Sequence, residues 1–279
     1  MADLSKHIAW MEVPDPRKDL DGLPMLSVFL DGVWDFWRAG IHQFILPSSP
    51  QWMGYDPPGD AKLYGDLYAD VADLMPNGCT FMSGIRPLDS HLKSMWDVEG
   101  WTALAAWLPT LTPIVVFDME VIFKSGRFES IDYSAWRQSL QVLPPDMTAW
   151  WNLPRILQDD DQSPNRHLHT AVLCMMIRMY RPGDLIMDAS VAWGGGSDVL
   201  KQSWAWQRQQ MVNVVGHDNL LDRILIAPTD KPHKIGDAEY YSADMAIPLL
   251  QDTAVTNVIW TDGERWCDVA AEFRKAVTG

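Results

Sequence analysis

The stretch of this chain that most constrains its fold runs over residues 181–216. It opens with a Pro-Gly helix stop, continues as an apolar segment that ends at Asp188, and then enters a turn of small residues. Helical spacing over 198–210 and a second apolar segment over 211–216 follow this turn. A strand, a turn, a helix and a strand in this order form the βαβ unit of a parallel sheet. The stretch therefore predicts an α/β protein.

Short apolar runs elsewhere in the chain predict further strands between helices. These strands are expected over 25–30, 44–46, 79–82, 114–117, 120–124 and 184–188. With 279 residues and 47% hydrophobic side chains, the chain can bury one large core. We therefore expect a single domain over 1–279, with the irregular segment 125–165 as a candidate recognition insertion.

The sequence also indicates a compartment. No stretch approaches the roughly 20 consecutive apolar residues of a membrane helix, and the first residues lack the apolar core of a signal peptide. Three scattered cysteines, Cys79, Cys174 and Cys267, do not form a disulfide framework. These features predict a cytoplasmic protein without membrane contact.

The formal net charge of −15 bears on the choice of partner. Proteins that bind nucleic acid usually present basic surfaces, because neutralising phosphates supplies much of the affinity. The acidity is more typical of a solubilising surface. Segment 155–234 has as many basic as acidic residues, so a nucleic acid would be expected to contact this part of the chain.

The turn after Asp188 resembles the cofactor motif of a known family. Its sequence, Asp188-Ala-Ser-Val-Ala-Trp-Gly-Gly195, is similar to the Asp-Pro-Ser-Ala-Gly-Trp-Gly-Gly variant of DNA amino-methyltransferases, although Ala189 and Ala192 replace a proline and a glycine. The resemblance covers about residues 27–225 and follows the β-like motif order of N4-cytosine and N6-adenine enzymes. It implies a Rossmann-like class I methyltransferase fold, in which helices flank a central, mostly parallel sheet.

The same resemblance implies S-adenosylmethionine as the cofactor. Open α/β sheets bind nucleosides beyond the carboxyl ends of their strands, where small residues let backbone amides approach the ligand. An acid at the end of the next strand can accept hydrogen bonds from the ribose hydroxyls. The residues implied for the cofactor are Asp188, Ser190, Trp193, Gly194, Gly195, Asp218, Asn219 and Asp244.

Two segments resemble the family's target-base motif, in which a polar residue and prolines precede an aromatic side chain that stacks on the flipped base. Segment 48–52 follows a predicted strand, as the motif requires. Segment 56–58 matches the letters better but lacks both the aromatic residue and a strand directly before it. We favour the first segment. The predicted catalytic residues are therefore Ser48, Ser49, Pro50 and Trp52, with Asp56, Pro57 and Pro58 as the alternative.

A C-terminal segment, 239–262, also resembles the catalytic-strand region of the family, with Gly-Glu-Arg at 263–265 where Pro-Pro-Tyr is expected. One sheet needs only one such strand. Either this segment is an added strand, or the N-terminal candidates are not catalytic.

These features predict methyl transfer from S-adenosylmethionine to an exocyclic amine of cytosine or adenine in DNA. Because every motif lacks at least one expected residue, the alternative is an inactive relative that serves as a binding or partner subunit, including a homodimer. Other chemistries lack their signatures: the chain has no G-x-G-x-x-G, no G-x-S-x-G and no phosphate-binding loop. No metal site is predicted, since His167, His169 and Cys174 have no second pair at zinc-site spacing.

Overall fold

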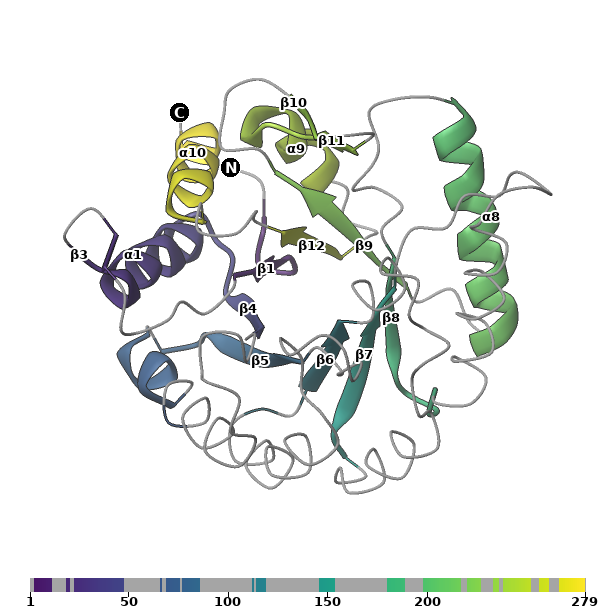
Figure 1. Ribbon diagram of the computed structural model, residues 1–279, viewed down its shortest axis with the longest axis horizontal. Coiled ribbons are helices and arrows are strands. Elements are labelled where there is room, and N and C mark those ends of the chain that lie inside the picture. The colour runs from purple at the N-terminus through teal and green to yellow at the C-terminus, as the bar shows by residue number, and fades with distance from the viewer. Residues whose placement is uncertain are drawn as a thin grey trace.

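Eight parallel strands close into a barrel in this computed structural model (Figure 1). The described residues are 3–11, 19–20, 23–47, 66, 69–75, 77–85, 112, 114–118, 146–153, 180–188, 198–216, 220–226, 233–235, 238–251, 256–260 and 266–278. The barrel strands are β1 (Ile8–Trp10), β4 (Gln43–Pro47), β5 (Thr80–Ile85), β6 (Ile114–Asp118), β7 (Thr148–Asn152), β8 (Leu185–Asp188), β9 (Leu220–Leu225) and β12 (Asn257–Trp260).

The other described elements lie around this barrel. Two small hairpins pair β2 (Asp19–Leu20) with β3 (Leu23–Pro24) and β10 (His233–Ile235) with β11 (Ala238–Tyr240). The helices are α1 (Met25–Arg38), α8 (Asp198–Val215), α9 (Ala243–Leu250) and α10 (Trp266–Thr278). None of the described helices combines the length and the apolar content that crossing a bilayer requires.

The strand register identifies the type of barrel. Partners such as Trp10, Ile45 and Met82 lie side by side on three successive strands. Going from register partner to register partner once around the barrel leads back to β1. The residue reached there lies eight positions before the starting residue. Eight parallel strands with a total shift of eight residues define the (β/α)8, or TIM, barrel.

The predicted Rossmann-like class I methyltransferase fold is therefore wrong. An open, mostly parallel sheet has two free edges and a point where the strand order reverses. Here β1 pairs with both β12 and β4, so the sheet has no edge and its order runs round without reversal. Four of the predicted strands overlap strands of the barrel, but the closure of the sheet was not predicted.

Side chains of the barrel strands alternate between the interior and the surrounding helices. The inward side chains come from all eight strands and form one buried cluster: Ile8, Trp10, Ile45, Met82, Val116, Trp150, Met187, Leu221 and Val258. The outward ones, such as Phe44 and Phe117, belong to a larger cluster that includes the helices. Because both faces of each strand are buried, many of the strands are nearly continuous apolar runs, and this explains why the sequence indicated β4, β5, β6 and β8.

Two predicted strands are helical in the structure. Residues 25–30 begin α1, whose fully buried Phe29, Val33 and Phe36 follow helical spacing. Residues 211–216 complete α8 and its cap, and Gln207 and Met211 are buried one turn apart on the same side of this helix. The valines of this segment suggested a strand, but tertiary packing overrides this weak local preference.

Helix α8 ends at a glycine whose conformation is left-handed. Gly216 has φ +82°, and its N–H donates to the Val212 carbonyl at 2.8 Å. We expect Gly216→Ala to lower the free energy of unfolding by about 1 kcal/mol, although a methyl group there would touch nothing within 4 Å. Urea unfolding would measure this loss. Gly216→Asn is the matched control and should lose less, because asparagine tolerates this conformation. An unchanged or raised stability of the alanine variant would contradict the expectation.

The first and last helices pack against each other beside the barrel (Figure 1). Phe36 of α1 and Phe273 of α10 have ring centroids 5.8 Å apart. Arg274 donates to Asp35 at 2.6 Å, and Arg38 reaches the same carboxylate oxygen at 3.1 Å. These contacts hold the two ends of the described chain together where the barrel closes.

At the amino end of the barrel, His7 ties the last strand to the first. It is fully buried, its Nε2 donates to the Leu250 carbonyl at 2.7 Å, and its Nδ1 accepts from the Asn257 N–H at 3.1 Å. This pairing requires a neutral ring, since a proton on Nδ1 would remove the second bond. Burial lowers the pKa of His7 below its ordinary value, although the bond to Leu250 opposes the shift.

Acid should therefore weaken the barrel at this seam. Below a pH of about 6.5 the unfolded His7 binds a proton that the folded one resists, so the free energy of unfolding falls with pH from there downward. The limiting slope is about 1.4 kcal/mol per pH unit. We expect urea unfolding between pH 7.5 and 5 to show a shallower decline for His7→Gln, which cannot titrate. Equal declines in both proteins would contradict this role.

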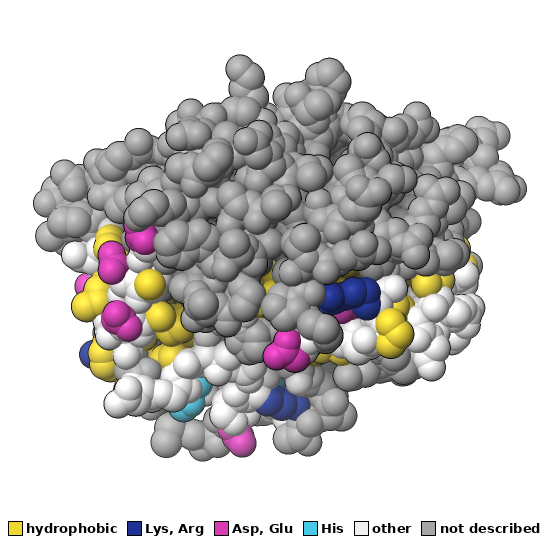
Figure 2. Space-filling view, turned by 90° about the horizontal axis from the view of Figure 1, so that it is seen from below, with side chains coloured by type: hydrophobic (Ala, Val, Ile, Leu, Met, Phe, Trp, Pro, Cys, Tyr) yellow, Lys and Arg dark blue, Asp and Glu magenta, His cyan; other side chains and the backbone are white. Residues whose placement is uncertain are grey.

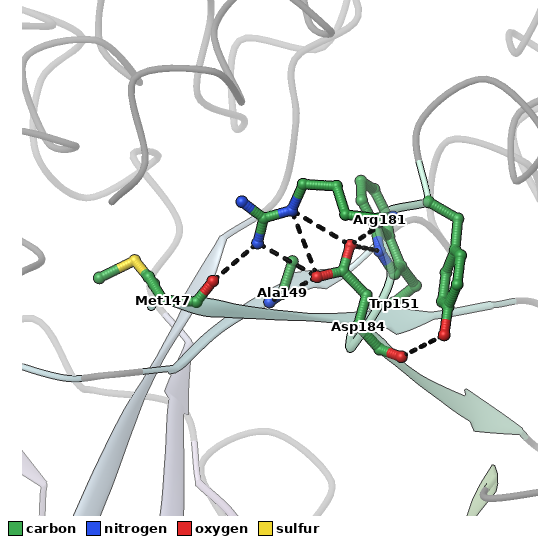
Figure 3. Close-up of polar contacts among 6 residues, drawn as sticks. Met147, Ala149, Trp151, Arg181 and Asp184 are labelled. Carbon is green, nitrogen blue, oxygen red and sulfur yellow. Dashed lines mark hydrogen bonds and ion pairs between the residues drawn. The ribbon is translucent and has the colours of Figure 1, made fainter. Parts of the chain in front are cut away.

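A charged cluster braces the same end of the barrel (Figure 3). Asp184, just before β8, is 2% exposed and accepts bonds from the Ala149 N–H at 3.1 Å and the Trp151 indole at 3.2 Å. Arg181 adds its backbone N–H at 3.0 Å and its Nη2 at 3.1 Å, and Nη2 also donates to the Met147 carbonyl at 2.8 Å. One carboxylate thus ties β7 to β8. In TIM barrels, residues at the amino face typically contribute to stability.

The candidate recognition insertion, 125–165, contains β7. Residues 148–152 pair with both β6 and β8, so this part of the range belongs to the barrel. Of the rest of the range, residues 146, 147 and 153 are also described. A role in recognition stays a prediction.

Candidate functional site

Charged residues are rare in the barrel strands, and two of them stand at strand ends. The only ionisable side chains within the eight described strands belong to Asp118, Asp188, Asp222 and Arg223. Asp118 and Asp188 are the last residues of β6 and β8. Because the strands are parallel, both residues lie at the carboxyl face of the barrel, where TIM-barrel enzymes carry their active sites.

Asp118 forms a hydrogen bond with a residue of the neighbouring strand. Asn152 ends β7 and is the register partner of Asp118, and its Nδ2 donates to Asp118 Oδ1 at 2.8 Å. The two side chains are 3% and 1% exposed. Each stands two residues beyond an inward residue of its strand, Val116 or Trp150, so alternation directs both toward the barrel axis. The pair lies directly above the apolar interior.

The interior below the pair forms a closed floor. Val116 and Trp150 are register partners and are fully or almost fully buried. On β5, the inward position level with Val116 is Gly84, which contributes no side chain there. Among the described residues, the buried Trp150 indole N–H has no hydrogen-bond acceptor. An apolar floor strengthens electrostatic interactions of the carboxylate above it, since water cannot screen them there.

The chemistry of this pair is that of an oriented carboxylate. Asp118 can move a proton or accept a hydrogen bond from a substrate hydroxyl, and the neutral Asn152 amide holds one of its oxygens without adding charge. A carboxylate and an amide oxygen are also ligands that hard cations prefer. However, no group of three acidic, histidine or cysteine side chains converges on a metal site within the described part of the chain.

The predicted target-base residues lie outside the described residues: Ser48, Ser49, Pro50, Trp52, Asp56, Pro57 and Pro58. Most of the predicted cofactor residues also lie outside them: Ser190, Trp193, Gly194, Gly195, Asp218 and Asn219. The other two are described but are far apart in the chain. Asp188 ends β8, whereas Asp244 lies in the first turn of α9, exposed and bonded by the Ser242 hydroxyl at 2.5 Å.

The prediction of an S-adenosylmethionine site, and with it the methyltransferase assignment, is wrong. The predicted site required a crevice at a reversal of strand order in an open sheet, and the closed barrel has no such reversal. It also required a strand that ends at Asp218. The strand after α8 is β9, which begins at Leu220, so Asp218 precedes its strand instead of ending it. The resemblance rests on a strand followed by small residues, a sequence pattern that occurs in both folds.

Asp118 and Asn152 were not among the predicted site residues. Each had a signal: an apolar run, Ile114–Phe117 or Thr148–Trp151, ends abruptly in a polar residue. After the first run a second acidic residue, Glu120, follows Asp118 by two positions and lies outside the described residues. What the sequence could not show is that the two runs are neighbours in register.

The predicted partners remain predictions. On the face drawn in Figure 2, the described Lys and Arg side chains lie in small, separate groups near acidic ones. The described residues on this face therefore form no continuous basic area for DNA.

Comparisons with known proteins give structural neighbours only. No known family model matches the chain, and no curated relative was found. The aldolase QR15 is 10% identical with a TM-score of 0.45, covering 99% of this chain and 97% of its own. Trehalose-6-phosphate hydrolase from Bacillus licheniformis is 11% identical with a TM-score of 0.49, covering 94% of this chain and 65% of its own. Dihydrodipicolinate synthase from Bacillus clausii is 11% identical with a TM-score of 0.43, covering 98% and 74%. At such identities and scores, no activity is transferred from these proteins.

Proposed function

We propose that this protein is an enzyme that hydrolyses a glycosidic bond in an uncharged carbohydrate, with Asp118 as an acid–base group at the carboxyl face of the barrel. The observation that carries the proposal is the buried Asp118 carboxylate, held at 2.8 Å by Asn152 at the carboxyl ends of adjacent strands. TIM barrels place catalytic residues at these strand ends, and a polar pair facing the axis there has no role in closing the core.

Glycosidic hydrolysis needs two carboxyl groups, one to protonate the leaving oxygen and one to activate water or attack the sugar. The chain supplies one candidate for the second group near Asp118. Glu120 follows Asp118 by two residues, which is the spacing of inward positions on a strand. Asp188 ends β8, on the other side of β7, but it directly follows the inward Met187 and therefore occupies an outward position.

The charge of the protein supports an uncharged substrate. A formal charge of −15 repels polyanions and would slow the approach of phosphorylated or nucleic-acid substrates. Fifteen tryptophans also suit a carbohydrate, because indole faces pack against the apolar faces of sugar rings. One of them, Trp260, ends β12 at the same face of the barrel.

Carbon–carbon bond cleavage through a lysine Schiff base is the competing chemistry for such a barrel. None of the eight strands, within the bounds the structure describes, contains a lysine. The carboxylate at a strand end therefore favours hydrolysis.

The test is release of reducing ends from a panel of purified polysaccharides that covers α- and β-linked glucans and polymers of N-acetylated amino sugars. We expect the wild-type protein to cleave at least one of them. Glu120→Gln should then abolish this cleavage, whereas Asp188→Asn, at an outward position of β8, should retain it. No cleavage across the panel would overturn the proposal.

A further inference from the structure

We propose that Asn152 is the positioning residue of this site, which orients the Asp118 carboxylate and sets its catalytic efficiency. This inference rests on the function proposed above and deepens it. Asn152 need not touch the reacting atoms. Its role in positioning Asp118 would explain why a buried amide stands at the end of β7.

The hydrogen bond from Asn152 restricts the rotation of the Asp118 carboxylate about the last bond of its side chain. The strand fixes the direction in which the Asp118 side chain leaves the backbone, but rotation of a carboxylate about its last bond is broad. A bond of 2.8 Å from Asn152 Nδ2 to Oδ1 stops this rotation at one oxygen. A hydrogen bond to a charged acceptor is stronger than one between neutral groups, and burial keeps water from competing for it.

The amide is itself held by rigid elements. Asp118 and Asn152 are register partners at the ends of paired strands, and the partners Val116 and Trp150 lie two residues below them. Catalytic groups held by strands keep their geometry better than groups held by loops. The choice of side chain also matters: a carboxylate at 152 would repel Asp118, whereas an amide supplies a donor without charge.

The experiment compares Asn152→Leu, which keeps the branched shape but lacks the donor, with Met187→Leu as the matched control. Met187 is the register partner of Asn152 and belongs to the apolar interior, so its variant changes packing near the site but not the hydrogen bond. We expect Asn152→Leu to lower kcat roughly ten- to a hundredfold with KM changed less than about twofold, because misorientation affects the reaction more than binding. Met187→Leu should leave both within about twofold. If Asn152→Leu does not fold, as thermal melting would show, Asn152→Ser replaces it.

A double-mutant cycle with Asp118→Asn shows whether Asn152 acts through Asp118. If it does, Asn152→Leu reduces the residual single-turnover rate of Asp118→Asn less than about twofold. An equal reduction in both backgrounds, or a kcat no lower than that of Met187→Leu, overturns the inference while the proposed function stands. Full activity of Asp118→Asn, or no cleavage by the wild type, overturns the proposed function and this inference with it.

Discussion

Asp118→Asn is expected to reduce kcat/KM of glycosidic cleavage by about 10²- to 10⁴-fold, the range that a general acid or base contributes. The substitution preserves the shape of the side chain and keeps an oxygen that can accept the hydrogen bond from Asn152 Nδ2. In the wild type this bond, to Asp118 Oδ1, is 2.8 Å long. It removes the capacity to carry a proton or a negative charge. Initial rates on the polysaccharide that the wild type cleaves would measure this loss.

The control is Asp73→Asn on the helical segment 69–74, where the aspartate is exposed. It removes the same charge from an exposed helical position outside the barrel strands, so its rate should equal that of the wild type. Thermal melting should show both variants folded, with Asp118→Asn within about 1 kcal/mol of the wild type because its hydrogen bond has a replacement acceptor. A folded Asp118→Asn that cleaves at the wild-type rate would exclude Asp118 from the chemistry.

The largest expected effect on stability comes from Asp184→Ala at the amino face. This substitution leaves the Ala149 N–H and the Trp151 indole without their acceptor and the half-buried Arg181 without its counter-charge. Removing one partner from a buried pair costs about 3–5 kcal/mol. For a domain of this size, that corresponds to a fall in Tm on the order of 10 °C. Urea unfolding followed by circular dichroism would measure it.

The chain contains a matched control for this prediction. Arg38 and Asp35 form a pair with the same spacing in sequence and the same distance, 3.1 Å, as Arg181 and Asp184. The side chains are 52% and 17% exposed in the first pair and 28% and 2% in the second. Arg38→Ala should therefore cost less than about 1 kcal/mol. Equal losses in Arg38→Ala and Asp184→Ala would show that burial does not set the strength of the Asp184 cluster.

Local patterns predicted the parallel strands well where both faces of a strand are buried. The runs 44–46, 79–82, 114–117 and 184–188 lie within or overlap β4, β5, β6 and β8. The same rule failed at 25–30 and 211–216, where apolar residues at helical spacing extend beyond the short window and belong to α1 and α8. A run of five or six apolar residues does not separate a buried strand from one side of a helix.

The candidate site was predictable only in part. Asp118 and Asn152 each end an apolar run, and this marks strand ends in the sequence. Their contact depends on the register between β6 and β7, which no local pattern encodes. The resemblance to methyltransferase motifs drew attention instead to the turn after Asp188, because a strand followed by small residues occurs in both open and closed α/β sheets.

The sequence by itself determined an alternation of buried strands and helices, and therefore a parallel α/β protein, because burial on both faces leaves an unbroken apolar run. Only the tertiary structure decided between an open sheet and a barrel. That choice depends on β1 pairing with β12, whose partners Ile8 and Val258 are 250 positions apart in the chain. Hydrogen bonds between backbones carry no side-chain signature, so the closing of the barrel, and with it the face where Asp118 and Asn152 meet, is settled by packing of the whole chain.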